Sequence, residues 1–186
     1  MRAAAATARL AAMRAARIPL LLATLAGLAG CGFQPLYGKV GDGAPVSEDL
    51  AAVKIDFISN RSGQILRNHL LDGMTPKGEP RRSAWTLQVA LNEPRPQELG
   101  TASDGSIVRF AFNVRANFRL LDASTGRVAF VGDATSNSSY EVTTSQYASV
   151  ASRDSARNRV LEDVALDIRS QLAVFFRERR EAKAVQ

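Results

Sequence analysis

The stretch VRFAFNVRANFRL, residues 108–120, decides the fold because hydrophobic and polar residues alternate along its whole length. One predicted face carries Val108, Phe110, Phe112, Val114, Ala116, Phe118 and Leu120. The opposite face carries Arg109, Ala111, Asn113, Arg115, Asn117 and Arg119. A repeat of two residues is typical of a β-strand that is buried on one face and solvated on the other. The stretch therefore predicts a long, half-buried strand.

Further strands are expected before and after this one. Asp122 to Gly126 predicts a turn, and residues 128–140 predict a partner strand. A strand of about 14 residues extends about 48 Å. Upstream, hydrophobic residues alternate from residue 85 to 91: Trp85, Leu87, Val89 and Leu91.

Two features complete the expected sheet. Pro94 and Pro96 follow the strand at 85–91 and predict a sheet edge or an irregular stretch, because proline cannot donate to the hydrogen-bond ladder. Asp104-Gly105 predicts a hairpin turn. Nearer the N-terminus, Val53, Ile55 and Phe57 alternate with polar residues and predict a short strand.

Two helices are expected. The first covers residues 61–72, with Asn60 or Ser59 as its N-cap and Gly73 at its end. The only histidine, His69, lies on its apolar stripe and is interpreted as a packed, hydrogen-bonded residue rather than a catalytic one. The second helix covers about residues 149–179, and its apolar stripe consists of Val160, Val164, Ile168, Leu172 and Phe175.

These elements predict an α+β fold, a four-stranded sheet with two helices packed on one face in the order β-α-β-β-β-α. Some thirty helical residues span about 45 Å. The long helix therefore matches the long hairpin in length, and we expect one to lie along the other.

The long helix breaks its own pattern near its start. Arg153, Asp154 and Arg157 lie on the continuation of the apolar stripe. Either the helix extends past the sheet and these residues are solvated there, or the charges contact one another or a partner. Such conflicts between local pattern and fold are places to look for function.

The N-terminus has the pattern of a secretion signal. Arginines at 2, 9, 14 and 17 precede an apolar run from Ile18 to Leu28, which is shorter than the roughly 20 residues of a membrane-spanning helix. Leu28-Ala29-Gly30-Cys31 then resembles a lipobox, in which the cysteine becomes acylated. The alternative is an incidental cysteine. The segments are therefore interpreted as a signal peptide (1–30), a lipidated tether (31–50), a single domain (51–176) and a charged C-terminal tail (177–186).

Composition narrows the possible functions. Four of the 24 basic residues lie in the signal, so the remaining chain is close to a charge of +2, and nucleic acid is not an expected partner. One histidine and one cysteine, itself assigned to lipid, supply neither a catalytic triad nor a zinc site. Glu162 and Asp163 are interpreted as solvated. We therefore expect no enzyme activity, no metal and no cofactor.

Residues 31–38, CGFQPLYG, together with the element order, resemble the LptE family of lipopolysaccharide-assembly lipoproteins. Residues 66–70, LRNHL, are similar to the family's first helix. The resemblance implies an outer-membrane lipoprotein, acylated (with palmitate, for example) at Cys31 and facing the periplasm. It also implies that the protein plugs and helps to assemble an LptD-like β-barrel, which delivers lipopolysaccharide to the cell surface.

Two groups of arginines are candidate contacts for the barrel or for the phosphates of lipopolysaccharide. One is the row Arg109, Arg115 and Arg119, and the other is the pair Arg153 and Arg157. The alternative for the row is a solvated face. The turn at residues 100–105 has no basic residue, although some members of the family have one there. The alternative function is a stand-alone, periplasm-facing lipoprotein module that binds a glycolipid or a protein.

Overall fold

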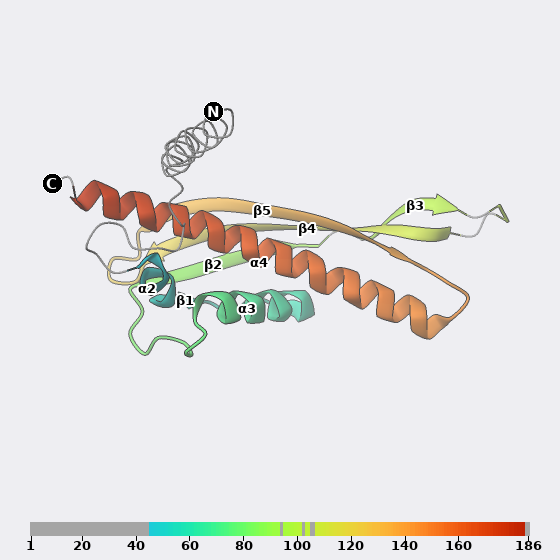
Figure 1. Cartoon of the computed structure of the whole chain (residues 1–186), viewed down its shortest axis with the longest axis horizontal. Helices are drawn as coiled ribbons and strands as arrows, with labels where there is room; N and C mark the ends of the chain where they lie inside the picture. The colour runs from blue at the N-terminus through green and yellow to red at the C-terminus, as the bar shows by residue number, and fades with distance from the viewer. Residues whose placement is uncertain (1–44, 94, 102, 105–106, 185–186) are drawn as a thin grey trace, which may run out of the picture. The chain divides into compact units, whose positions relative to one another are not determined.

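The computed structural model describes residues 45–184 except 94, 102 and 105–106, and strand β4 (Ile107–Asp122) organises it (Figure 1). β4 pairs antiparallel with β5 (Val128–Glu141) along one side. Its other side pairs antiparallel with β2 (Trp85–Asn92) and then with β3 (Gln97–Thr101). β1 (Val53–Ile55) extends the sheet by pairing parallel with β2. The expected α+β class is confirmed.

The expected four-stranded layout is wrong because the sheet is five-stranded, in the order β1-β2-β4-β3 with β5 beside β4. The additional strand is β3, which lies in the segment expected to be an edge or irregular. It is a true edge strand, nearly all exposed, and its register with β4 shifts around Gly100. The hairpin expected near Asp104 does connect β3 to β4, although part of its turn lies outside the described residues.

Alternation in β4 separates the two faces of the sheet as predicted. Its buried residues are Phe112, Val114, Ala116, Phe118 and Leu120, each 1 % exposed or less. They pack with the helices in one hydrophobic core. Trp85 on β2 joins the core through Phe175 and Phe176, whose ring centroids lie 6.2 and 5.7 Å away.

Helix α3 (Asn60–Met74) connects β1 to β2. Asn60 has a φ of 68°, and its side-chain Oδ1 accepts a hydrogen bond from the Gly63 N–H at 2.8 Å. This bond satisfies one of the free N–H groups of the first helical turn. Of the two expected N-caps, Asn60 therefore forms the capping bond and Ser59 does not.

Helix α4 (Gln146–Ala184) lies along β5 and β4 (Figure 1), as the matching lengths predicted. Val160, Val164, Ile168 and Leu172 are completely buried. The helix does not stop at residue 176, after which the expected C-terminal tail begins, because α4 continues to Ala184. The Arg179 guanidinium lies 4.8 Å from the Trp85 ring centroid, and Arg180 forms an ion pair with Asp49, so these charges bind the last turns of α4 to the domain.

Two other expectations are wrong near the start of the domain. The tether was expected to reach residue 50, but α2 (Val46–Ala51) buries Val46 and Leu50 in the core. Phe57 was expected to be an inward strand residue, but β1 ends at Ile55 and Phe57 is 74 % exposed. Ile58 occupies the buried position instead, as the chain turns into α3.

Candidate functional site

Among the described residues, no helix packs on one side of the sheet, and most outward side chains there are polar, with Ala90, Ala111 and Val131 between them. We call this side the open face and define it by the polar outward residues of three adjacent strands: Gln88 and Asn92; Arg109, Asn113, Arg115, Asn117 and Arg119; Asp133, Thr135, Asn137 and Ser139. These residues lie opposite one another because side chains alternate between the faces of a pleated sheet. Most are neutral amides or hydroxyls, which can both donate and accept hydrogen bonds.

The predicted arginine row lies on the open face, but its three members have different partners. Arg109 donates from Nη2 to Glu141 Oε1 at 2.6 Å and is therefore neutralised locally. Arg119 donates from Nη2 to Gln88 Oε1 at 3.3 Å. Gln88 in turn donates from Nε2 to Asp56 Oδ2 at 3.1 Å, so a short polar chain crosses from β4 to the end of β1.

Arg115 differs from both neighbours. Within the part of the chain that the structure describes, it forms no hydrogen bond or ion pair. It lines a shallow hollow of about 330 Å³ together with Asn92, Asn113, Val114 and Thr135. A guanidinium with five donors therefore lies among neutral hydrogen-bonding groups from three strands. This arrangement can bind an anionic group and the hydroxyls of the molecule that carries it.

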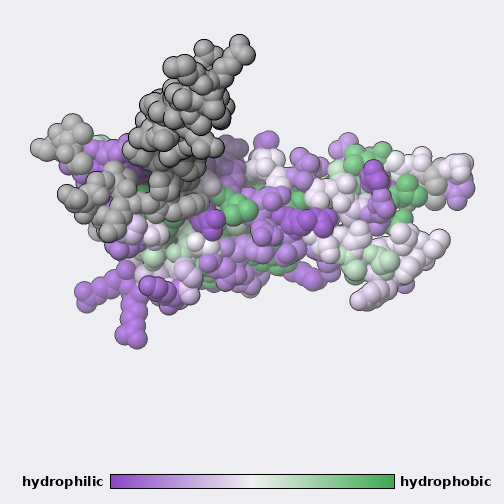
Figure 2. All heavy atoms as spheres, in the orientation of Figure 1, coloured by the Kyte–Doolittle hydropathy of each residue, from purple (hydrophilic) through white to green (hydrophobic). Residues whose placement is uncertain are grey.

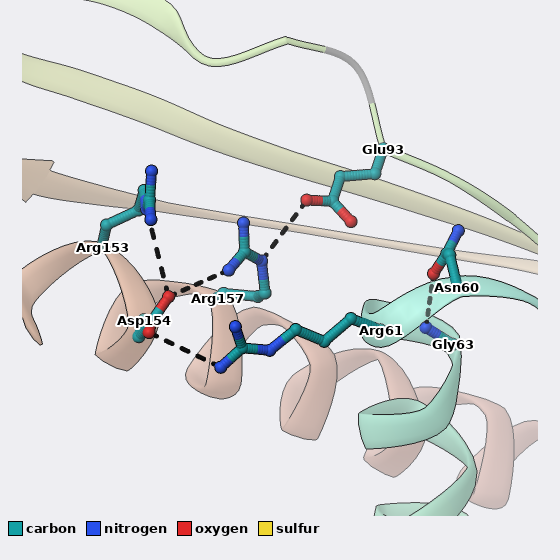
Figure 3. A network of polar contacts seen from close by, with 7 residues as sticks. All are labelled: Asn60, Arg61, Gly63, Glu93, Arg153, Asp154 and Arg157. Atoms are coloured by element: carbon teal, nitrogen blue, oxygen red, sulfur yellow. Dashed lines mark hydrogen bonds and ion pairs between the residues drawn. The ribbon is translucent and has the colours of Figure 1, made fainter. Parts of the chain in front are cut away.

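The second predicted group, Arg153 and Arg157, lies on the helical side of the sheet. Figure 3 shows both side chains pointing toward Asp154. Arg157 donates to Asp154 Oδ1 at 3.0 Å and to Glu93 Oε1 at 3.4 Å, whereas Arg153 Nε lies 4.0 Å from Asp154. Arg61 at the start of α3 lies 3.7 Å from the other oxygen of Asp154. The charges therefore contact one another, which is one of the two alternatives left open by the sequence.

Burial shows that this network has a structural role at Arg157. Only 18 % of the Arg157 side chain and 22 % of the Glu93 side chain are exposed. The Arg157 guanidinium also lies 5.3 Å from the Phe112 ring centroid, a cation–π distance. The network thus joins α4 to the end of β2 and to the start of α3. Arg153 and Arg61, which are 45 % and 75 % exposed, are the members accessible to a partner.

The other residues singled out in the sequence lie outside both arginine groups. Cys31 lies outside the described residues. His69 is half-buried, and its Nε2 lies 3.2 Å from Asn158 Oδ1, in agreement with a packed, hydrogen-bonded residue. Glu162 is exposed, and hydrophilic side chains cover much of the molecular surface seen in Figure 2. Asp163 accepts a hydrogen bond from Ser136 Oγ at 3.1 Å.

The described residues contain no group of three or more side chains that could hold a metal ion. Among the same residues, no helix combines the length and apolar character needed to span a membrane.

Sequence reasoning missed an apolar hollow of about 400 Å³ at the base of the domain. Its lining includes Leu50 of α2, Met74 at the end of α3, Pro76 after α3 and Arg169 of α4. The spacing of Val46 and Leu50 by four residues was the available signal for α2, but six residues are too few to produce a clear helical period.

The chain matches one known protein family in sequence. A family model described as "LptE: Lipopolysaccharide-assembly" matches residues 50–172. Among curated proteins, no sequence matches this chain.

Two solved structures are similar to this chain. A lipoprotein from Caulobacter crescentus CB15 is 25% identical, with a TM-score of 0.62, and the match covers 72% of this chain and 96% of that one. A minor lipoprotein from Acinetobacter baumannii is 15% identical, with a TM-score of 0.48 over 66% of this chain and 91% of that one. The first of these supports the architecture described above.

Proposed function

Because the chain belongs to the LptE lipopolysaccharide-assembly family, we propose that it is a non-enzymatic outer-membrane lipoprotein that occupies and helps to assemble an LptD-like β-barrel. In this role it supports delivery of lipopolysaccharide to the cell surface. The observation that carries the proposal is the open face, a largely polar surface that spans three strands and that none of the described helices covers.

The chemistry of the open face suits the interior of a large barrel. Large outer-membrane barrels have polar interiors, because their side chains alternate between lipid and lumen along each strand. Asn113, Asn117, Asn137, Thr135 and Ser139 offer donors and acceptors without a charge that would need a fixed counter-ion. These neutral positions can exchange water for a polar wall without leaving an ionised group unpaired.

Membrane attachment in this proposal comes from Cys31. Acyl chains contribute about 0.8 kcal/mol per buried CH₂, so two or more chains hold a protein at a bilayer stably.

Contact with lipopolysaccharide is assigned to Arg115. Phosphate is a strong acceptor for a guanidinium, and sugar hydroxyls pair with amides such as Asn92 and Asn113. Arg109 is a poorer candidate because Glu141 already neutralises it.

The test is isolation of the full chain from outer membranes in detergent. We expect a stable one-to-one complex with a large β-barrel. The Cys31→Ala variant should fold normally but leave the membrane fraction, because the acyl chains have no other attachment point. Elution without a barrel would instead favour a stand-alone lipoprotein module that binds a glycolipid or a protein.

A further inference from the structure

Among the described residues, no strand lies beside the outer edge of β5. β5 is 14 residues long and pairs with β4 on one side only, among the residues that the structure describes. A strand edge presents main-chain N–H and C=O groups that can pair with another polypeptide.

Register identifies which groups point outward. The Val142 N–H donates to the Val108 carbonyl at 3.0 Å, so even-numbered residues at this end of β5 bond to β4. The odd-numbered residues must then direct their N–H and C=O groups away from β4. Two contacts with α4 agree: Gln171 Nε2 donates to the Asp133 carbonyl at 2.8 Å, and the Glu141 N–H donates to Ser152 Oγ at 3.4 Å.

Between these two contacts, α4 also contacts β5 through Asp163, which accepts a hydrogen bond from the Ser136 side chain, but no side chain of α4 bonds to the outward main chain there. We call this interval, from Thr135 to Ser139, the edge window. The outward main-chain groups of Thr135, Asn137 and Ser139 have no hydrogen-bond partner in the described part of the chain, and all three side chains are exposed. The window has neither the lysine nor the proline with which proteins usually protect an edge strand. Five residues of strand extend about 17 Å.

We propose that the edge window is a strand-addition site for a short extended segment of a partner protein, with a basic residue beside Asp133. Main-chain hydrogen bonds supply affinity in this mode of recognition. Charge indicates the nature of the segment. Asp133 is exposed and forms no ion pair among the described residues, whereas Glu141 at the other end is paired with Arg109 at 2.6 Å.

A second copy of this chain fits the window poorly. The β5 strand of a second copy is 14 residues long, much longer than the five-residue window, and α4 contacts it at Asp133 and Glu141. If two copies paired through their windows, the α4 contacts of one copy would lie against those of the other at both ends. In the antiparallel register centred on Asn137, Asp133 of one copy would also lie opposite Glu141 of the other. Like charges in directly opposed positions destabilise a strand pair.

The test uses the full chain purified in detergent and two synthetic heptapeptides, acetyl-KTVTVTK-amide and acetyl-ETVTVTE-amide. At about 1 mM lysine peptide, we expect amide hydrogen exchange of Thr135, Asn137 and Ser139 to slow by about tenfold, which corresponds to a Kd of about 0.1 mM. The glutamate peptide should protect less, because its charges repel Asp133. Unchanged exchange with the lysine peptide overturns the proposal.

Proline substitutions in β5 distinguish loss of peptide binding at the edge from loss of folding stability. Asn137→Pro removes an outward N–H but no bond to β4, so its melting temperature should stay close to that of the parent. Ser138→Pro removes a bond to β4 and should melt earlier. Asn137→Pro should abolish the peptide's protection of Thr135 and Ser139, whereas Asn137→Ala should keep it. If Asn137→Pro retains full protection, the peptide binds elsewhere and the proposal fails.

Discussion

The Arg157 network gives the sharpest test of how the domain is held together. Replacing Arg157 with methionine keeps a long apolar stem but removes the charge that joins α4 to Glu93 and Asp154. Glu93, only 22 % exposed, would then lose its one ion-pair partner among the described residues.

The expected cost is the sum of three contacts. The Arg157–Glu93 pair contributes about 1.5 kcal/mol, at the lower end for a hydrogen bond to a charged group. The Asp154 contact is discounted to about 0.5 kcal/mol because that side chain is 36 % exposed and partly screened. The cation–π contact with Phe112 adds about 0.5 kcal/mol. A loss of about 2.5 kcal/mol lowers the melting temperature of a domain of this size by about 8 °C.

The assay is thermal unfolding followed by circular dichroism, and Arg153→Met is the matched control. Arg153 is 45 % exposed and reaches Asp154 only at 4.0 Å, so its loss should cost less than about 0.5 kcal/mol, or roughly 2 °C. In a double-mutant cycle, Glu93→Gln and Arg157→Met should couple by about 1 kcal/mol. Equal shifts for the two arginine variants, or strictly additive effects in the cycle, would refute a structural role specific to Arg157.

Three further predictions follow from the geometry. Arg115→Ala should weaken binding of purified lipopolysaccharide by about tenfold, as loss of a charge-assisted contact would, whereas Arg109→Ala should change it little; equal losses in a binding titration would count against the assignment. Gly132→Ala should lower the melting temperature by several degrees, because its Cβ would lie 2.5 Å from Phe118 Cζ; an unchanged melting curve would contradict this packing. The Asp122 carboxylate accepts hydrogen bonds from the Ser124 side chain and from the main-chain N–H groups of residues 124 and 125, and these bonds lower its pKa from 3.8. The carboxylate therefore stabilises the fold fully above pH 3.8, and this stabilisation is lost as the pH falls through the lowered pKa. The difference in melting temperature between the parent and Asp122→Ala should therefore narrow on acidification below about pH 4, and a constant difference would exclude this role.

Strong periodic signals in the sequence predicted the centre of the fold. β4 and α4 each bury one side over many residues, so their alternation and their apolar stripe are long enough to exceed chance. The turn at Asp122–Gly126 was equally predictable, because Gly126 adopts a φ of 68° and Asp122 accepts hydrogen bonds from the turn.

The incorrect predictions concern elements whose stability comes from distant partners. β3 is exposed on nearly every residue, so no hydrophobic alternation marks it, and it exists because β4 extends beyond β2 and offers a free edge. Phe57 continues the alternation of β1 in sequence, but the chain leaves the sheet there to reach the N-cap at Asn60.

The sequence predicted which residues form the candidate site, but not which of them have hydrogen-bond or ion-pair partners. Alternation alone placed Arg109, Arg115 and Arg119 on one face. Which of them remains without a partner depends on Glu141 and Gln88, which lie on other strands, so it could not be inferred from β4 alone.

The many uncharged amides and hydroxyls of the open face have a consequence for how its contacts respond to ionic strength. Dissolved ions weaken attraction between exposed charges over about 8 Å at physiological salt, but they do little to amide and hydroxyl hydrogen bonds. A partner docked on the asparagines and threonine of this sheet would therefore stay bound in concentrated sodium chloride. An anion bound at Arg115 would be released under the same conditions, so the two kinds of contact can be separated by a simple salt wash.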